Sequence, residues 1–301
     1  MKIYKNFKLQ KKHLRGVIAI GNFDGVHLGH QKVINEAKKK AKKNNAPFGV
    51  MTFEPVPVMF FNKEVKNHRI NSLEQKKIYL KKLKLDFLII AKFNKNFSIL
   101  SAEKFIEKEL VKKTKCKFLY VSKNFRFGFK RSGSILTLKK YEKTFNYKCM
   151  VTKPYKINKK VISSTLIRKK ISLGHISEVN KLLNRKWNIQ GKVIKGKKLG
   201  RKIGFPTCNL NLNDYIVPRL GVYSVIVKGA NFNKRGIANI GYRPTFKGRN
   251  LLLEVNIFGI YKNLYNKVLT VSFKKFLRAE KKFKNLENLK KQIKIDIKLA
   301  K

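Results

Sequence analysis

The chain has 301 residues and a formal net charge of +56, with 43% hydrophobic and 11% aromatic residues. This apolar content supports a sizeable core and excludes a disordered chain, while the length favours about two domains. No apolar run approaches the ~20 residues that span a bilayer, and the basic N-terminus lacks the apolar segment of a secretory signal, so no membrane attachment is expected.

The excess of positive charge has two interpretations. The 72 Lys and Arg residues far outnumber the 16 Asp and Glu residues, and such a balance attracts polyanions. Lys, Asn, Ile and Phe are also the residues of AT-rich codons, and the lysines are spread over the whole chain rather than gathered among aromatics. A solvated basic surface is therefore favoured and no specific nucleic-acid partner is expected; a nucleic-acid-binding protein is the less favoured alternative.

Three cysteines, Cys116, Cys149 and Cys208, lie far apart in the sequence. No pair has the spacing of metal ligands, and the odd number does not indicate a disulfide framework. Free thiols in a reducing, cytoplasmic compartment are predicted.

Apolar runs alternate with amphipathic segments in the first half of the chain. Strands are predicted at 17–20, 48–53, 87–91 and 118–121, and helices at 27–43, 72–85 and 101–113. This alternation predicts a parallel sheet with helices on both faces, as in an α/β Rossmann-like domain. Ligands bind beyond the carboxyl ends of such strands, so the chemistry is expected in the loops after Ile20, Phe53 and Val121.

The pattern changes near residues 183–185, which predicts a first domain over 1–183 and a second over 184–301. Short β-rich runs at 189–194, 221–227, 235–240, 251–258 and 267–276 are separated by Gly, Pro and Asn. They predict a small antiparallel β-barrel. A terminal helix is expected at about 286–299, where apolar residues recur at helical spacing: Leu286, Leu289, Ile293 and Ile297.

The string GNFDGVHLGH, at positions 21–30, lies between the first strand and its helix. Glycines allow a close backbone approach to a ligand, and the N–H groups at a helix start suit phosphate. His27 and His30 lie one turn apart and can both donate to phosphate oxygens. A lone histidine is more often a packing residue, but two of the chain's 5 histidines on this turn favour a functional site.

Two further strings carry polar side chains suited to nucleotides. ISSTLIR, at 162–168, supplies three hydroxyls and a guanidinium at another helix start; alone, it is equally well explained as an ordinary N-cap. The glycines of 191–204 alone indicate a flexible loop between strands. The string Pro206-Thr207-Cys208-Asn209 that follows them favours a nucleotide site instead.

The string HxGH together with ISSTxxR resembles nucleotidyltransferases that transfer adenylyl groups. Positions 124–134, NFRFGFKRSGS, and positions 200–209, read as GxxxGxPTxN, resemble the flavin loop and the kinase signature of prokaryotic bifunctional riboflavin kinase/FMN adenylyltransferase, also called FAD synthetase. The strings NIGYRPTF, LLLEVNIF and FLRAEKKF follow in the order of that family. The chain departs from the usual family pattern at five positions of interest: Val56, Ser122, Asn124, Asn256 and Gly259.

The resemblance implies ATP-dependent phosphorylation of riboflavin to FMN, followed by adenylyl transfer from ATP to FMN, which yields FAD and pyrophosphate. It implies three catalytic residues: His27 and His30 for adenylyl transfer and Glu254 as the kinase base. The implied nucleotide-binding residues are Gly21, Asn22, Phe23, Asp24, Gly29, Ser163, Ser164, Thr165, Arg168, Gly200, Gly204 and Pro206. The implied flavin-binding residues are Asn124, Phe125, Arg126 and Arg243. Mg²⁺ is the implied cofactor, with Thr207 and Asn209 as its ligands.

Glu254 is one of only 16 acidic residues and lies in an apolar, strand-like run. Without the flanking motifs, a carboxylate at a strand edge paired with a lysine would be the simpler interpretation. Two alternatives to the two-step enzyme remain at this point: a chain that retains one activity, with the kinase favoured, and the basic nucleic-acid-binding protein.

Overall fold

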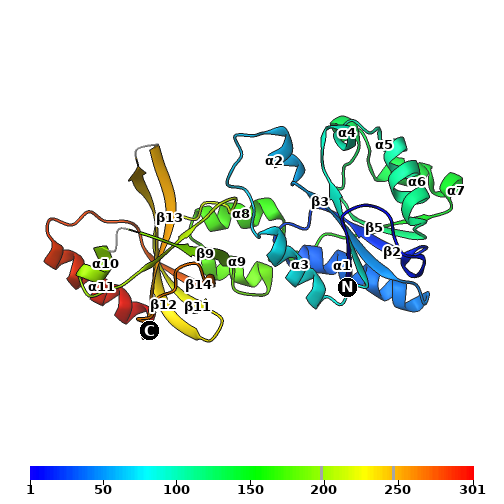
Figure 1. The fold of residues 1–301 in the computed structure, drawn as a ribbon. Coiled ribbons are helices and arrows are strands. Elements are labelled where there is room, and N and C mark those ends of the chain that lie inside the picture. Colours follow the sequence, from blue (N-terminus) through cyan, green and yellow to red (C-terminus); the bar gives the residue numbers. More distant parts are fainter. Residues whose placement is uncertain (197–198, 246–247) are drawn as a thin grey trace. The chain divides into compact units, whose positions relative to one another are not determined.

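The computed structural model describes residues 1–196, 199–245 and 248–301. The chain divides into two compact units (Figure 1): Met1–Val65 with Leu73–Ser163, and Lys66–Ser72 with Ser164–Lys301. Each unit has its own sheet. Within the described ranges, no helix combines the length and the hydropathy needed to cross a membrane.

The first unit is built on a six-stranded sheet in the order β1-β4-β3-β2-β5-β6, in which every neighbouring pair is parallel. The strands are β1 (Lys2–Tyr4), β2 (Val17–Ile20), β3 (Phe48–Glu54), β4 (Phe87–Lys92), β5 (Phe118–Ser122) and β6 (Lys148–Thr152). The four central strands confirm the prediction. The two edge strands were not predicted, because β1 has only three residues and the apolar run of β6, CMV, is equally short.

Helices cover both faces of this sheet, as predicted. Successive residues of a strand point to opposite faces, and Ile18 and Ile20 pack in one apolar cluster while Val17 and Ala19 pack in another. The α-helices of the unit are α1 (Leu28–Lys43), α2 (Pro57–Phe61), α3 (Leu73–Lys82), α4 (Lys95–Ser98), α5 (Ala102–Lys104), α6 (Ile135–Lys140) and α7 (Glu142–Phe145).

The helix predicted at 101–113 is present but irregular. The Ser101 side chain accepts a hydrogen bond from the Lys104 N–H and caps α5, and a π-helix continues over Phe105–Lys112. Short 3₁₀ turns lie at Lys11–His13 and Phe129–Arg131. A two-stranded hairpin, β7 (Lys156–Ile157) and β8 (Lys160–Val161), precedes the end of the unit.

The second unit contains the predicted barrel, closed in the order β10-β13-β12-β11-β14-β9 with antiparallel neighbours. Its strands are β9 (Asn188–Ile194), β10 (Cys208–Asn211), β11 (Gly221–Lys228), β12 (Asn233–Thr245), β13 (Gly248–Ile257) and β14 (Val268–Arg278). Its helices are α8 (Ser164–Ser172), α9 (Ile176–Leu183), α10 (Leu199–Lys202) and α11 (Leu286–Ala300). The terminal helix is confirmed, and β10 is the strand that the pattern did not predict.

Helices α8 and α9 and residues 66–72 belong to the barrel unit because polar contacts attach them to it. The Trp187 indole N–H donates to the Ile70 carbonyl at 2.9 Å, and the Asn180 amide donates to the Phe273 carbonyl of β14 at 3.0 Å. The barrel unit therefore includes residues 66–72 and 164–183, all of which precede position 184. The division describes folding units, so the functional domains over 1–183 and 184–301 stay a prediction.

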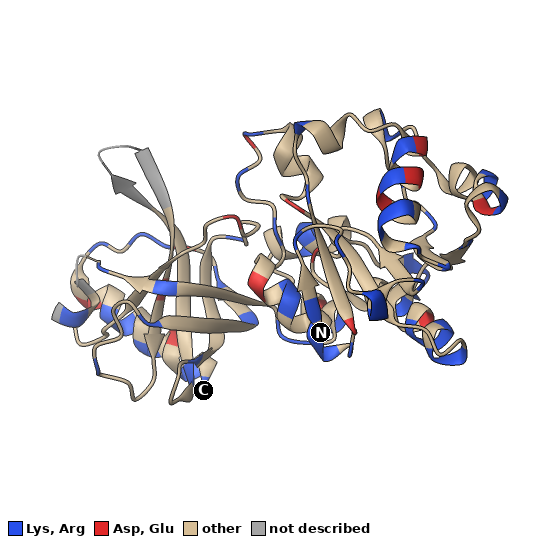
Figure 2. Cartoon of the chain, turned by 45° about the vertical axis from the view of Figure 1, so that its right-hand side comes forward, with Lys and Arg blue, Asp and Glu red and all other residues tan. Residues whose placement is uncertain are grey.

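Basic residues are distributed over the helices and strands of both units, and acidic residues are few (Figure 2). Several of the lysines form ion pairs with exposed carboxylates one helical turn away, as Lys77 does with Glu74 and Lys291 with Glu287. Such surface pairs contribute little to the stability of a fold. The net charge therefore does not itself define a site.

Candidate functional sites

The topology of the parallel sheet places the GNFDGVHLGH turn at a switch point. Strand β2 lies between β3, to which α1 connects it, and β5, which is reached later in the chain. In open α/β sheets, ligands bind in the crevice at the carboxyl ends of the strands where the order reverses in this way. The turn after Ile20 and the loop after Ser122 both lie at that edge of the sheet.

The turn is held in a conformation that ordinary residues avoid. Phe23 and Val26 have positive φ angles of 46° and 38°, yet both side chains are almost fully buried. A β-branched residue in this region is an outlier, and the surrounding packing has to hold it there. Asp24 is buried between them, at 2% exposure. Backbone outliers of this kind concentrate at ligand sites.

The two histidines form one compact pair. His27 is the N-cap of α1, and its Nδ1 accepts the His30 backbone N–H at 3.3 Å. The two rings stack with centroids 3.6 Å apart. Since Nδ1 of His27 is an acceptor, a neutral ring carries its proton on Nε2, which is the nitrogen that can donate to an anion. The packing favours Gly29, because a Cβ there would lie in tight contact with the His27 ring, at 3.1 Å, and with the Ile162 carbonyl, at 3.3 Å.

A buried lysine that the sequence did not reveal braces the same turn. Lys76 of α3 is 1% exposed, and its Nζ donates to the Asn22 carbonyl at 2.9 Å. The Thr52 hydroxyl, at the end of β3, donates to the same oxygen at 3.0 Å. One carbonyl of the turn thus accepts hydrogen bonds from two neighbouring elements. No sequence signal distinguishes Lys76 from the other lysines.

The predicted flavin loop follows β5 at the same edge of the sheet. Asn124 and Arg126 are exposed, and Phe125 is half-buried and stacks on Phe127 at 5.5 Å. Phe127 and Gly133 exchange backbone hydrogen bonds, which close the loop. Asn124 and Arg126 are therefore accessible to a ligand.

The ISSTLIR string is divided between the compact units. Ile162 and Ser163 are the last residues of the first unit. The Ile162 carbonyl is the backbone group that lies close to Gly29. Ser164 begins α8 in the second unit, which confirms a helix start, and Thr165 is exposed. The Arg168 Nε donates to the His68 carbonyl at 2.8 Å, a contact that fixes the direction of the guanidinium.

The barrel unit contains a cavity of about 370 Å³ beside the PTCN string. Polar side chains line one part of it: Asn209 on β10, Glu254 on β13 and Asn239 on β12. Thr207, just before β10 begins, also lines this part. Glu254 lies directly opposite both Asn209 and Asn239 in the strand register. Residues opposite each other share one face of a sheet, so three of these side chains form a single inward row.

The turn before this row depends on its two glycines. A Cβ on Gly200 would lie 2.4 Å from the Phe205 carbonyl, and Gly204 has a φ of +88°. The Asn256 side chain donates to the Pro206 carbonyl at 2.7 Å and braces the turn from β13. Asn256, a departure from the family pattern, thus has a defined structural role. The Arg243 side chain, predicted to bind flavin, lies outside the described residues.

Two other departures also fit their surroundings. Val56 is buried at 3% exposure in the position preceding α2. Gly259 has a φ of +71° in the turn that follows β13, a conformation that favours glycine. Ser122 ends β5 with an exposed side chain.

Burial raises the pKa of the Cys208 thiol to about 12. At pH 8 only about one molecule in ten thousand would carry the thiolate, the form that reacts with alkylating agents. We expect iodoacetamide at pH 8 to leave Cys208 unmodified by mass spectrometry, and Cys208→Ala to leave the kinase activity that the sequence resemblance implies at its wild-type level. Urea-unfolded protein, in which all three thiols are exposed, is the control. Rapid alkylation of folded protein at Cys208 would contradict the prediction.

The fold and the two sites define the class of protein: a nucleotidyltransferase-like α/β unit joined in one chain to a nucleotide-binding barrel. Two family profiles match it in tandem, FAD synthetase over residues 9–166 and riboflavin kinase over residues 183–301. The bifunctional riboflavin kinase/FMN adenylyltransferase of Buchnera aphidicola subsp. Schizaphis graminum is 41% identical over 97% of this chain and 95% of its own length. That of Haemophilus influenzae is 38% identical over 100% and 98%. The chain therefore belongs to the family of bifunctional riboflavin kinase/FMN adenylyltransferases.

A solved structure agrees with this architecture over nearly the whole chain. A protein from Streptococcus pneumoniae, described as a macrolide-efflux protein, has a TM-score of 0.87 and 30% identity, and the match covers 99% of this chain and 97% of that one. The two units of this chain therefore have counterparts in a single experimental fold. Because that protein is described by another activity, the similarity supports the fold of this chain and not its function.

Proposed function

We propose that the chain phosphorylates riboflavin with ATP to give FMN and then transfers an adenylyl group from a second ATP to FMN, with release of pyrophosphate. The observation that carries this proposal is the presence of both family domains, in order, in one chain. Relatives of the same two-domain length are bifunctional riboflavin kinase/FMN adenylyltransferases. The functional domains are proposed to be residues 1–183 and 184–301.

The kinase step is assigned to the barrel cavity. Glu254 would accept the proton of the riboflavin 5′-hydroxyl as that oxygen attacks the γ-phosphorus of ATP, and ADP would leave. Gly200, Gly204 and Pro206 would shape the turn that meets the phosphates. Much of the rate enhancement in phosphoryl transfer comes from such positioning and from charge stabilisation.

Mg²⁺ fits the donor atoms at this site. The Oδ1 of Asn209 is buried and has no hydrogen-bond partner within the described residues, and the adjacent Thr207 offers a hydroxyl. Neutral oxygen donors with room for waters and phosphate oxygens suit this cation. When bound, Mg²⁺ would offset the charge of the polyphosphate. Thr207 and Asn209 would hold it.

The adenylyl-transfer step is assigned to the turn after β2. The FMN phosphate oxygen would attack the α-phosphorus of ATP, and the bond to pyrophosphate would break. His27 and His30 would donate to the phosphate oxygens as charge develops, within the turn formed by Gly21, Asn22, Phe23, Asp24 and Gly29. Ser163, Ser164, Thr165 and Arg168 are proposed as further triphosphate-binding residues. Asn124, Phe125, Arg126 and, in the kinase, Arg243 are proposed as flavin-binding residues.

We also propose a cytoplasmic location. All three cysteines are free thiols in the structure, as expected in a reducing compartment. ATP, riboflavin and FMN are the partners that the two steps require.

One assay tests the proposed function. Purified protein is incubated with riboflavin, ATP and Mg²⁺, and FMN and FAD are resolved by chromatography. We expect both products, with FMN appearing first. FMN without FAD would reduce the function to the kinase, whereas neither product, together with salt-sensitive DNA binding, would favour the basic nucleic-acid-binding protein.

A further inference from the structure

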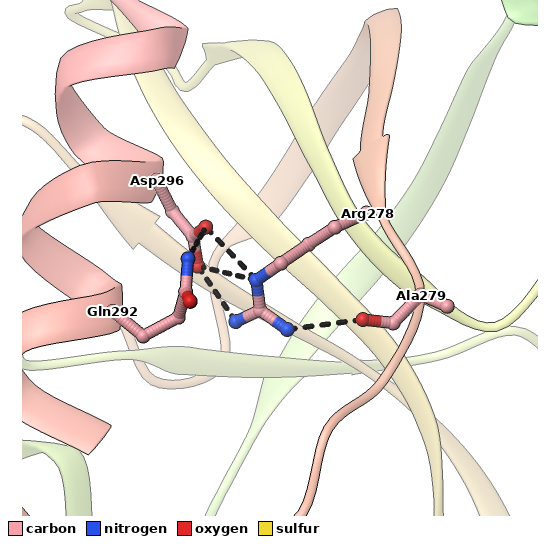
Figure 3. Close-up of polar contacts among 4 residues, drawn as sticks. All are labelled: Arg278, Ala279, Gln292 and Asp296. Carbon is pink, nitrogen blue, oxygen red and sulfur yellow. Dashed lines mark hydrogen bonds and ion pairs between the residues drawn. The ribbon is translucent and has the colours of Figure 1, made fainter. Parts of the chain in front are cut away.

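A buried ion pair joins the end of the barrel to the terminal helix. Arg278 is the last residue of β14, and its Nε and Nη2 donate to the two carboxylate oxygens of Asp296 at 2.7–3.1 Å (Figure 3). Asp296 is 1% exposed and also accepts from the Gln292 amide at 3.0 Å. Paired donors of this geometry fix orientation as well as distance.

The pair lies in the wall of the kinase cavity. Arg278 and Asp296 both line it, and so do Leu289 and Ile293 of the same helix. Positions 289, 293 and 296 follow one another at helical spacing, so α11 presents one face to the cavity. On this side the apolar residues Phe283, Leu289 and Ile293 line the cavity together with charged ones, whereas Thr207, Asn209 and Glu254 lie on the β10–β13 side. The charged residues are Arg278, Glu280, Lys281 and Asp296.

The same guanidinium also shapes the chain that leads into α11. Arg278 Nη1 donates to the Ala279 carbonyl at 3.0 Å, and the guanidinium carbon lies 5.8 Å from the centroid of the Phe283 ring. Phe283 lines the cavity too. One side chain thereby connects a strand, a turn, an aromatic ring and a helix, all of which border the same space.

Other contacts attach α11 from its middle to its C-terminal end, where Ile293 and Ile297 pack against a small apolar cluster. Ala300 packs with Val222 and Ile237 in this cluster, and the Ser224 hydroxyl donates to the Ala300 carbonyl at 3.4 Å. The Arg278–Asp296 contact lies one turn nearer to the cavity-lining residues. It therefore adds a directional polar contact to the apolar packing of Ile293 in holding this part of α11 beside the cavity.

We propose that Arg278 and Asp296 are positioning residues for riboflavin: they hold the apolar wall formed by Phe283, Leu289 and Ile293 against the flavin ring. Neither residue is assigned a role in proton or phosphoryl transfer. Weakening the pair should displace the wall while Thr207, Asn209 and Glu254 stay in place on their own strands. The expected signature is a raised KM for riboflavin with little change in kcat.

The test compares the kinetic constants of three variants with wild type. Asp296→Asn keeps the size of the side chain but removes its charge, and Arg278→Lys keeps the charge but removes the paired donors. We expect the riboflavin KM to rise about tenfold or more in each, and kcat to change by less than about threefold. Because a half-broken buried pair can unfold a protein, Arg278→Met/Asp296→Leu is the third variant; replacing both charges by apolar groups is well tolerated. It should fold and still show the raised KM.

Glu287→Gln is the matched control, since Glu287 lies on the same helix in an exposed pair with Lys291; its KM should equal the wild-type value. Thermal unfolding of the same preparations should match wild type and reports on the fold of the barrel unit, while adenylyl transfer to supplied FMN, which is assigned to the other unit, should stay unchanged. A wild-type KM in the folded double variant, or a loss of kcat at constant KM, would overturn the inference. The inference rests on the proposed kinase: absence of riboflavin phosphorylation by wild type would refute the kinase, whereas wild-type KM values in active variants refute only the positioning role.

Discussion

His30→Ala should abolish FAD formation from FMN and ATP while leaving riboflavin phosphorylation intact. The His30 ring stacks on His27 at 3.6 Å and contacts Phe23 edge-on at 5.2 Å, so its direction is fixed before a nucleotide binds. A donor preorganised toward developing charge is typically worth about 100- to 1,000-fold in rate. We expect a loss of that size in kcat for adenylyl transfer, measured by chromatography of FAD. Riboflavin kinase activity should stay within about twofold of wild type.

The kinase belongs to the other compact unit, so thermal unfolding, which should match wild type, reports on the fold of the unit that contains His30. His175→Ala is the matched control, because His175 is half-exposed and its Nδ1 lies 3.4 Å from a carboxylate oxygen of Glu178 on α9. It should keep both activities. Retention of FAD synthesis by His30→Ala would remove this histidine from the mechanism, and loss of both activities would mean that the substitution acts on the fold.

The strands of both sheets were predictable where apolar residues form continuous or alternating runs. Residues 17–20 and 87–91 are buried throughout, as a central parallel strand requires. Strand β10 was not predicted because its residues, Cys208–Asn211, combine buried apolar and polar positions and lack an apolar run. Asn209 lines the cavity, and the polar residues of β10 interrupt the apolar run by which a strand is recognised in the sequence.

The candidate sites were predictable to the extent that their residues are adjacent in the sequence. His27 with His30, and Thr207 with Asn209, lie within single turns, so spacing alone brings each pair together. Lys76 reaches the first site from α3, which begins at Leu73, 43 residues after the turn ends at His30. The Arg278–Asp296 pair likewise depends on how α11 folds back on β14. In a chain with 72 basic residues, composition cannot indicate which ones the fold buries.

Glu254 lies at the centre of a polar row on the inner face of the barrel. Its strand neighbours are Asn209 on β10 and Asn239 on β12, and all three line the cavity. A general base has to lie within hydrogen-bond reach of the proton that it accepts, and a side chain on a central barrel strand is well suited to this requirement.

Glu254→Gln should lower riboflavin kinase kcat by about 100-fold or more, since the amide keeps the shape and hydrogen bonding of the carboxylate but cannot accept the proton. Binding should be largely preserved, so we expect the KM values for riboflavin and ATP to change by less than about threefold. Phosphorylation of riboflavin is followed by chromatography, and thermal unfolding, which should match wild type, measures the folding of the barrel unit. Glu287→Gln, the same substitution at an exposed position of α11, should have no effect on either reaction. Near-normal kinase turnover in Glu254→Gln would show that the proton goes elsewhere, in which case the carboxylate would be a structural member of the polar row.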